Sequence, residues 1–392
     1  MKETIDILQF FGVKKPLFVM SGLAGDDINR FVDREELLKY FIITIQIRQN
    51  CAIVGEPGSG KTSFLLKLRD AMKDTMYCDY LQFSFPVEEV DKSKLHFLRK
   101  ILGCLLYLIA KNKQLQDQFE PGDIAFETQR LEYSIIIEDH FKAITTSGMG
   151  VDAGTKSGTL FNLLVPAEFR AKLNAKRQKE KGQVEKKDYP IHDEKTLYNT
   201  ILRLLDRIAE PIVLFIDELD KIGRYPLEFP GWDKEVTKIL DLSRDIMLSN
   251  KLVLVLSLQN ELYEHLCNAR DGQSEASGAA ALGLIHAFRK LEGFDLNFAA
   301  AAVNTSLQYA GYKGKMDDLF EKGTIDIVLT IVKGNPRLLM YHLLELCKKA
   351  CLENQKQITL EMLRDYFIQI NKIDKPQWEK LAGQWLKTQA GE

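Results

Sequence analysis

The sequence has few cysteines, no long hydrophobic run and almost no net charge, and each shortage excludes a class of protein. Its six cysteines are scattered and none forms a C-x-x-C pair, so neither a disulfide framework nor a cysteine metal site is expected. The longest apolar run without a charge, residues 101–110, is far too short to cross a bilayer. The opening residues do not resemble a signal peptide. We therefore expect a cytoplasmic protein with free thiols and no membrane partner.

The charge balance also limits the partners. A formal net charge of −2 gives no global attraction to nucleic acid, so such a partner would need a local basic patch. Apolar content of 45% and charged content of 28% are those of an ordinary globular protein. A chain of 392 residues is long enough for two or three units, each with its own core.

One glycine-rich stretch carries a specific signal. Residues 55–62 read G-x-x-x-x-G-K-T, the phosphate-binding loop, between an apolar run and a helical pattern. Glycines let the backbone wrap around an anion, with N–H groups and a helix N-terminus pointing inward. Lys61 is expected to reach the β- and γ-phosphates, and the Thr62 hydroxyl to bind Mg²⁺. The predicted phosphate-binding residues are Gly55, Glu56, Pro57, Gly58, Ser59, Gly60, Lys61, Thr62 and Ser63.

Apolar runs alternate with helical periodicities along the chain, which predicts an α/β fold. We expect a P-loop NTPase fold, a parallel sheet sandwiched by helices, followed by a smaller all-α lid domain. Strands are expected at 51–54, 77–85, 212–217, 251–258 and 288–296. Helices are expected at 34–48, 93–110, 195–208, 298–310, 316–332, 336–352 and 359–371, and again around Trp378 and Trp385.

These elements suggest four parts of the chain. The predicted parts are an N-terminal extension at 1–30, a nucleotide-binding α/β domain at 31–296, a helical lid at 297–371 and a tail helix at 372–392. A long insertion is expected inside the α/β domain at about 114–195, where regularity weakens.

An acidic pair indicates that the chain hydrolyses the nucleotide as well as binding it. Asp217 and Glu218 follow a continuous apolar run, at a strand tip where open α/β sheets bind ligands. Asp217 can hold Mg²⁺ through water, and Glu218 can orient and deprotonate an attacking water. A structural capping role is the alternative for Glu218.

Four motifs together resemble a known family. The stretch 31–35, the phosphate loop, Ile-Asp-Glu-Leu-Asp at 216–220 and Gly-Asn-Pro-Arg at 334–337 occur in the order seen in AAA+ ATPases. The chain is most similar to the branch of replication-initiator (origin-recognition-like) and STAND-type ATPases. The resemblance covers about residues 28–371, although 114–195 is longer than a minimal AAA+ core needs. The DNA-reading winged helix of many initiators is not expected in this sequence.

The resemblance implies further site residues. Phe31, Val32 and Arg34 would contact adenine. Asn260 would read the γ-phosphate as the first sensor, with Gln259 and Ser257 left open as alternatives. Pro336 and Arg337 are similar to the second sensor. A neighbouring subunit would supply an arginine, for which Arg289 and the less favoured Arg270 lie in the right interval.

Two functions from different classes remain open at this point. One is an ATP and Mg²⁺ dependent switch that forms a homo-oligomer with ATP and engages a protein effector. The other is a DNA-associated ATPase, such as a transposition regulator, a replication-type loader or a mobile-element defence component. Its support is the basic stretch 170–187, with Arg170, Lys172, Lys176, Arg177, Lys179 and Lys181. A solvated helix or connector is the alternative for that stretch, and a small-molecule kinase or GTPase is a weaker third function.

Overall fold

A computed structural model describes residues 6–32, 34–83, 93–119, 194–219, 232–270 and 283–390. The chain divides into two compact units. The sheet unit comprises Glu36–Val54 and Leu65–Lys290, and the helical unit comprises Met1–Glu35, Gly55–Phe64 and Leu291–Glu392. Among the helices of the described ranges, none combines the length and the apolar content needed to cross a membrane.

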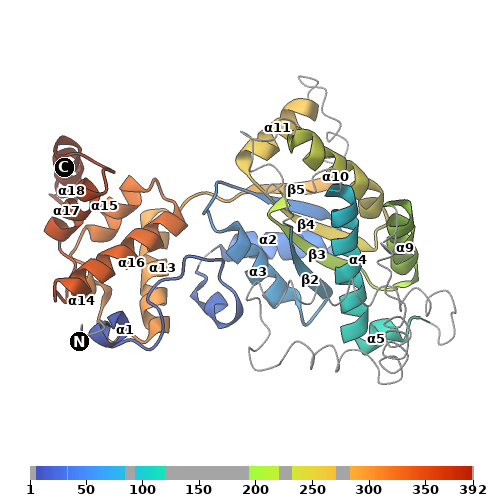
Figure 1. The fold of residues 1–392 in the computed structure, drawn as a ribbon, viewed down its shortest axis with the longest axis horizontal. Helices are drawn as coiled ribbons and strands as arrows, with labels where there is room; N and C mark the ends of the chain where they lie inside the picture. The colour runs from blue at the N-terminus through green and yellow to red at the C-terminus, as the bar shows by residue number, and fades with distance from the viewer. Residues whose placement is uncertain are drawn as a thin grey trace, which may run out of the picture. The chain divides into compact units, whose positions relative to one another are not determined.

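The sheet unit is built on five parallel strands (Figure 1). They are β1 (Asn50–Val54), β2 (Tyr77–Gln82), β3 (Ile212–Asp217), β4 (Leu252–Leu258) and β5 (Ile285–Lys290). Their spatial order is β2-β3-β4-β1-β5, so β4 separates the strand before the phosphate loop from the strand that ends in Asp217. The predicted α/β fold with a parallel sheet is confirmed.

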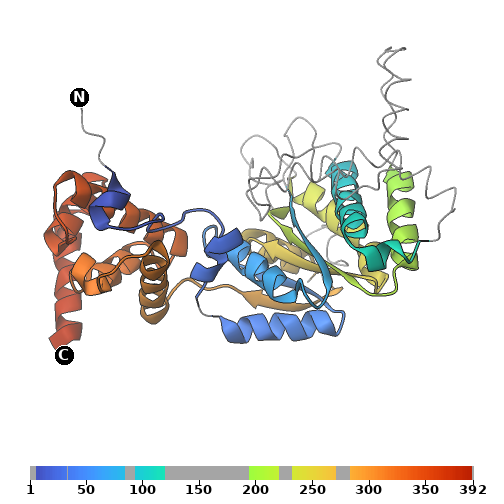
Figure 2. The same cartoon turned by 90° about the horizontal axis from the view of Figure 1, so that it is seen from below.

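Both faces of this sheet are buried, as the continuous apolar runs predict. Along β3, Leu214 and Ile216 join the core formed with the helices on one face. Their neighbours Val213 and Phe215 point the other way and are also fully buried. One face is covered by α4 (Ser93–Lys111), α9 (Glu194–Arg207) and α10 (Trp232–Leu248). Figure 2 shows α2 (Glu35–Gln46) on the opposite face.

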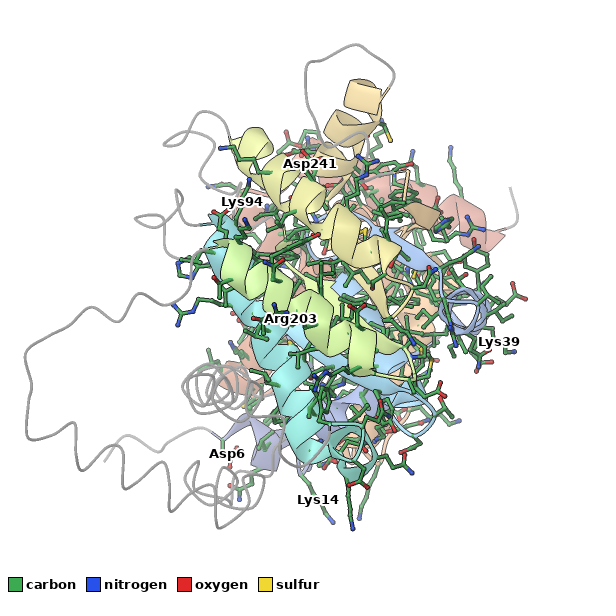
Figure 3. All side chains as sticks on the ribbon, turned by 90° about the vertical axis from the view of Figure 1, so that its right-hand side faces the viewer. Asp6, Lys14, Lys39, Lys94, Arg203 and Asp241 are labelled. Atoms are coloured by element: carbon green, nitrogen blue, oxygen red, sulfur yellow. The ribbon has the colours of Figure 1, made fainter. Side chains whose placement is uncertain are left out.

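The helical layer of the sheet unit has a polar outer side. Figure 3 looks onto α4, α9 and α10, on which Lys94, Arg203 and Asp241 are labelled. The amphipathic pattern of α9 agrees with this view, because Leu197, Ile201 and others are buried while Arg203 is exposed. The sheet unit also contains α5 (Lys113–Gln116), α11 (Asn260–Arg270) and most of α3 (Lys61–Met72).

The helical unit has its own core and confirms the predicted C-terminal helical region. Its elements are α1 (Ile7–Phe11), the 3₁₀ helix η1 (Gly25–Arg30), α13 (Leu296–Ala310), α14 (Met316–Leu319), α15 (Thr324–Ile331), α16 (Pro336–Leu352), α17 (Leu360–Gln369) and α18 (Lys375–Ala390). The N-terminal residues belong to this core, since Phe11, Leu17 and Phe18 pack with apolar side chains of α13 and α16.

Three predicted element boundaries were wrong. The single helix expected at 316–332 is two helices, α14 and α15, because Gly323 has a left-handed φ of +94°. A Cβ on Gly323 would also come within 2.6 Å of the Trp385 ring. Strand β2 ends at Gln82, three residues early. Strand β5 begins at Ile285 and ends at Lys290, because Asp295 already caps α13 by accepting from Phe298 N at 2.9 Å.

Candidate functional site

The phosphate loop connects the end of β1 to the start of α3. Gly58 and Gly60 have φ values of +84° and +98°, which other residues rarely adopt. The loop closes on itself, because Ser59 N donates to Glu56 O at 3.1 Å. A Cβ on Gly58 would lie 2.8 Å from Asn335 Oδ1, so glycine is required there for space as well as for conformation.

Two groups of the loop are suited to an anion. The Lys61 ammonium donates to Gly55 O at 2.7 Å and to Glu56 O at 3.0 Å, which keeps it against the curve of the loop. The Ser59 side chain is 3% exposed, and its Oγ has no hydrogen-bond partner among the described residues. A buried hydroxyl without a partner is unfavourable unless a ligand or water satisfies it. The residues present therefore fit a bound phosphate.

Segments of the helical unit hold the loop from outside. Asn335 Nδ2 donates to Pro57 O at 2.9 Å, and Arg337 N donates to Gly58 O at 3.3 Å. At the start of α3, the Ser63 hydroxyl accepts from Leu23 N at 3.0 Å. The Gly-Asn-Pro-Arg motif is thus in direct contact with the phosphate loop, although Asn335 and Pro57 are 278 residues apart in the sequence.

The residues predicted to contact adenine lie in the same unit as the loop. The ring of Phe31 is 6.4 Å from the ring of Phe64 on α3, and Val32 is half-buried. Arg34 Nη2 donates to Glu292 O at 2.7 Å, and its guanidinium lies 6.0 Å from the Phe294 ring centroid.

The acidic pair lies at the carboxyl end of β3, where Asp217 is only 2% exposed. Tyr80 of the neighbouring strand β2 donates its hydroxyl to Asp217 Oδ2 at 2.7 Å. The backbone N of Glu218 donates to Asp217 Oδ1 at 2.9 Å. Burial and the Asp217 charge raise the pKa of Tyr80 well above its usual value, so Tyr80 remains a donor. The orientation of the Asp217 carboxylate is therefore fixed from two sides.

Glu218 has a strained backbone and a defined side-chain partner. Its φ of +60° lies in the left-handed region, which is unfavourable for a residue with a Cβ and is often found at functional sites. Gln82 Nε2 donates to Glu218 Oε2. Gln82 is supported in turn by Lys100 of α4, whose Nζ donates to Gln82 O at 3.1 Å. Burial lowers the pKa of Lys100.

Polar groups also lie at the carboxyl end of β4. This strand lies between β3, which ends in Asp217, and β1, which precedes the phosphate loop. Ser257 is fully buried, and neither its Oγ nor Gln259 Nε2 has a hydrogen-bond partner in the part of the chain that the structure covers. Asn260, the first-sensor residue expected from the family resemblance, is the first residue of α11. A buried polar atom that the described residues leave without a partner is suited to contact a ligand, which applies to Ser257 Oγ and Gln259 Nε2. Asn260 keeps the role implied by the resemblance, so all three stay candidates.

The remaining predicted residues lie on the surface or outside the described ranges. Arg337 is exposed near the start of α16. Arg289 is exposed on the edge strand β5, where its guanidinium lies 4.0 Å from the Tyr40 ring centroid. The side chain of Arg270 and the basic stretch 170–187 lie outside the described residues.

Sequence reasoning missed Tyr80, Gln82 and Asn335 as parts of the site. Gln82 is the last residue of β2 and lies in register with Asp217 on the adjacent strand. A polar residue that ends a strand beside an acidic strand tip was a usable signal for Gln82. The same signal indicates Tyr80, because Tyr80 and Gln82 are two residues apart on β2 and side chains two apart on a strand share a face.

A comparison with solved structures found distant likenesses. The Aeropyrum pernix ORC1 protein in complex with DNA is similar over 89% of this chain and 68% of its own, with 10% identity and a TM-score of 0.46. The RuvB Holliday junction branch migration motor of Thermotoga maritima is similar over 91% and 76%, with 9% identity and a TM-score of 0.40. A Walker-type ATPase of Pyrococcus abyssi is similar over 95% and 93%, with 12% identity and a TM-score of 0.42. Likenesses this distant say nothing of activity or partners.

A family model identifies the chain more directly. A search of curated proteins gave no match. The model of the KAP family P-loop domain matches residues 50–258, which is more than half of the chain. The matched range begins at β1 and ends at β4, and it contains both the phosphate loop and the acidic pair. The chain therefore belongs to the KAP family of P-loop NTPases.

Proposed function

We propose that the chain binds ATP with Mg²⁺ and hydrolyses it, and that the nucleotide state controls its assembly and its engagement of a partner. The observation that carries this proposal is the phosphate loop itself. The loop has glycines with positive φ and a lysine ammonium that donates to its carbonyls, both of which suit a triphosphate. It also has a buried serine hydroxyl that no described residue satisfies. The loop lies within residues 50–258, the range that matches the KAP family P-loop domain.

The chemistry follows from the named side chains. Lys61 and the loop N–H groups bind the β- and γ-phosphates. Thr62 and Asp217 would hold Mg²⁺, which would supply neutralisation of charge on the phosphate oxygens. Glu218 orients a water molecule and accepts its proton. The strained backbone of Glu218 and its bond from Gln82 support a positioned, functional carboxylate.

The other predicted residues complete the proposal. Phe31, Val32 and Arg34 contact the base, which we propose is adenine. One of Ser257, Gln259 and Asn260 reads the γ-phosphate, and Arg337 responds to it from α16. Arg289 acts on the site of a neighbouring copy, a role to which its exposure on an edge strand is suited.

The bond from Tyr80 to Asp217 gives a first prediction about the metal. Tyr80→Phe removes only the hydroxyl that fixes Asp217 Oδ2. We expect the Mg²⁺ concentration for half-maximal nucleotide binding to rise about 10- to 100-fold, since hydrogen bonds to charged groups contribute about 1.5–3 kcal/mol. Fluorescent ATP binding titrated with Mg²⁺ measures this change.

A matched control lies on the same strand. Tyr77→Phe removes a hydroxyl that donates to Gln114 Oε1 at 2.9 Å, at the other end of β2. Its Mg²⁺ requirement should equal that of the wild type. An equal rise in both variants would assign the effect to weakened packing of β2 and not to the orientation of Asp217.

A second candidate function rests on the basic stretch. Residues 170–187 contain eight basic and two acidic residues, which is enough local charge to bind a phosphate backbone. In this alternative the ATPase acts on DNA, and the nucleotide state controls DNA binding instead of binding to a protein effector.

One sedimentation experiment separates the two functions. We expect the mass of the chain to increase when a non-hydrolysable ATP analogue is added, because ATP orders the contacts between copies. The same runs with a labelled DNA duplex measure DNA binding. A monomer with and without analogue would contradict the switch. Absence of a salt-sensitive DNA complex, or one that survives neutralisation of Lys176, Arg177, Lys179 and Lys181, would contradict the DNA function.

A further inference from the structure

The side chain of Asn335 has two separate hydrogen bonds. Its Oδ1 accepts from Leu338 N at 3.1 Å, which caps the N-terminus of α16. Its Nδ2 donates to Pro57 O at 2.9 Å, in the middle of the phosphate loop. The amide group of Asn335 therefore caps α16 and also contacts the phosphate loop. We propose above that this loop binds ATP.

The second bond fixes the direction of a loop amide. In a planar trans peptide the C=O and the N–H point in opposite directions. With Pro57 O held by Asn335, the N–H of Gly58 is turned away from α16. The next carbonyl, Gly58 O, is also held from α16, because it accepts from Arg337 N at 3.3 Å. Two consecutive peptide planes of the loop are thus set by the start of one helix.

This contact is close and well supported. A Cβ on Gly58 would lie 2.8 Å from Asn335 Oδ1 and 3.1 Å from Arg337 Cβ, so only glycine lets the loop and helix approach. Gly334, with φ of +73°, accepts through its carbonyl from Phe294 N at 2.7 Å. This bond fixes the backbone immediately before Asn335, which in turn fixes where the Asn335 side chain contacts the loop.

We propose that Asn335 is a positioning residue for the phosphate loop. It sets the direction of the loop peptides before nucleotide binds, and it links nucleotide affinity to the placement of α16. The inference rests on the proposed function, because it assumes that the loop binds a nucleotide. Removal of the amide donor leaves the loop free to rotate these peptides, and binding must then include the cost of ordering them.

The two roles of Asn335 can be separated by substitution. Serine caps helices as well as asparagine does, but its shorter side chain does not reach Pro57 O. For Asn335→Ser we expect ATP and ADP to bind about fivefold more weakly, the value of one neutral hydrogen bond. The melting temperature without nucleotide should stay close to that of the wild type. Asn335→Ala removes both bonds and should lower both the affinity and the melting temperature.

A control variant removes a cap that is away from the loop. Thr359 caps α17 by accepting from Met362 N at 3.2 Å. Thr359→Ala should lower the melting temperature, as Asn335→Ala does, without changing nucleotide affinity. An affinity of Asn335→Ser within twofold of the wild type would overturn the inference. An equal loss of affinity in Thr359→Ala would also overturn it, because the effect would then be general destabilisation.

Hydrogen exchange of residues 55–60 tests the same inference without any ligand. We expect the loop amides of Asn335→Ser to exchange faster than those of the wild type, and those of Thr359→Ala to be unchanged. If the wild-type chain binds no nucleotide, the proposed function fails, and this comparison alone decides the positioning role. Unchanged loop exchange in Asn335→Ser would then overturn it.

Discussion

Replacement of Glu218 by Gln is expected to stop ATP turnover and leave nucleotide binding intact. A positioned general base contributes about 10²–10⁴-fold to a rate, so kcat should fall by about 100-fold or more. The change is nearly isosteric, and the new amide oxygen can still accept from Gln82 Nε2, so the left-handed turn at residue 218 is not disturbed on steric grounds. Phosphate release under steady-state conditions measures kcat, and fluorescent ATP binding measures affinity.

The other end of the same strand offers a matched control. Glu210 is exposed and precedes β3, at the edge opposite to Glu218. Glu210→Gln makes the same chemical change, removes the same charge and should alter neither kcat nor affinity. Turnover that persists unchanged in Glu218→Gln would remove Glu218 from the mechanism and leave it a structural role at the end of β3. A parallel loss of binding would show that its main role is to shape the site.

The parts of the site that were predictable are those that lie close together in the sequence. The phosphate loop is a run of consecutive residues, and its requirement for glycine at 58 and 60 follows from local backbone geometry. Asp217 was predictable for the same reason, since the apolar run before it fixes where the strand ends.

The supporting contacts were not predictable, because they join residues far apart in the chain. Tyr80 and Asp217 are separated by 137 positions, and Asn335 and Pro57 by 278. A single sequence gives no pairing between such positions until the strand order is known. The helix boundary at Gly323 was missed on different grounds. An isolated glycine in a helical pattern is often tolerated, and the Trp385 ring that packs against it comes from α18.

The strand order adds one constraint that the motifs alone did not supply. β4 lies between β1, which precedes the phosphate loop, and β3, which ends in Asp217. The polar residues at the carboxyl end of β4 therefore lie at the end of the strand that is flanked by these two strands. At this end of the strand lie Ser257 Oγ and Gln259 Nε2, two buried atoms for which the described residues provide no hydrogen-bond partner. Mutating each of them is therefore a more informative search for the first sensor than relying on the resemblance to Asn260.

Lys61→Ala is expected to lose most of its nucleotide binding at ATP concentrations about ten times the Kd of the wild type. The ammonium of Lys61 is a cation with three N–H donors, and it donates to Gly55 O and Glu56 O at the curve of the loop. Loss of charged contacts to the phosphates, at about 1.5–3 kcal/mol each, should weaken binding by about 100-fold or more. The shift in melting temperature on adding ATP measures this directly, because a ligand at 100 times its Kd stabilises the folded chain by about 2.7 kcal/mol.

Lys67→Ala is the control for this variant, because Lys67 lies on the same helix α3, beyond the first turn. It should keep the full ATP-dependent shift in melting temperature. If Lys61→Ala also kept it, the loop would not be where the triphosphate binds. The roles proposed for Thr62, Asp217 and Glu218 would then fail together, since each is defined by its relation to a nucleotide held in that loop.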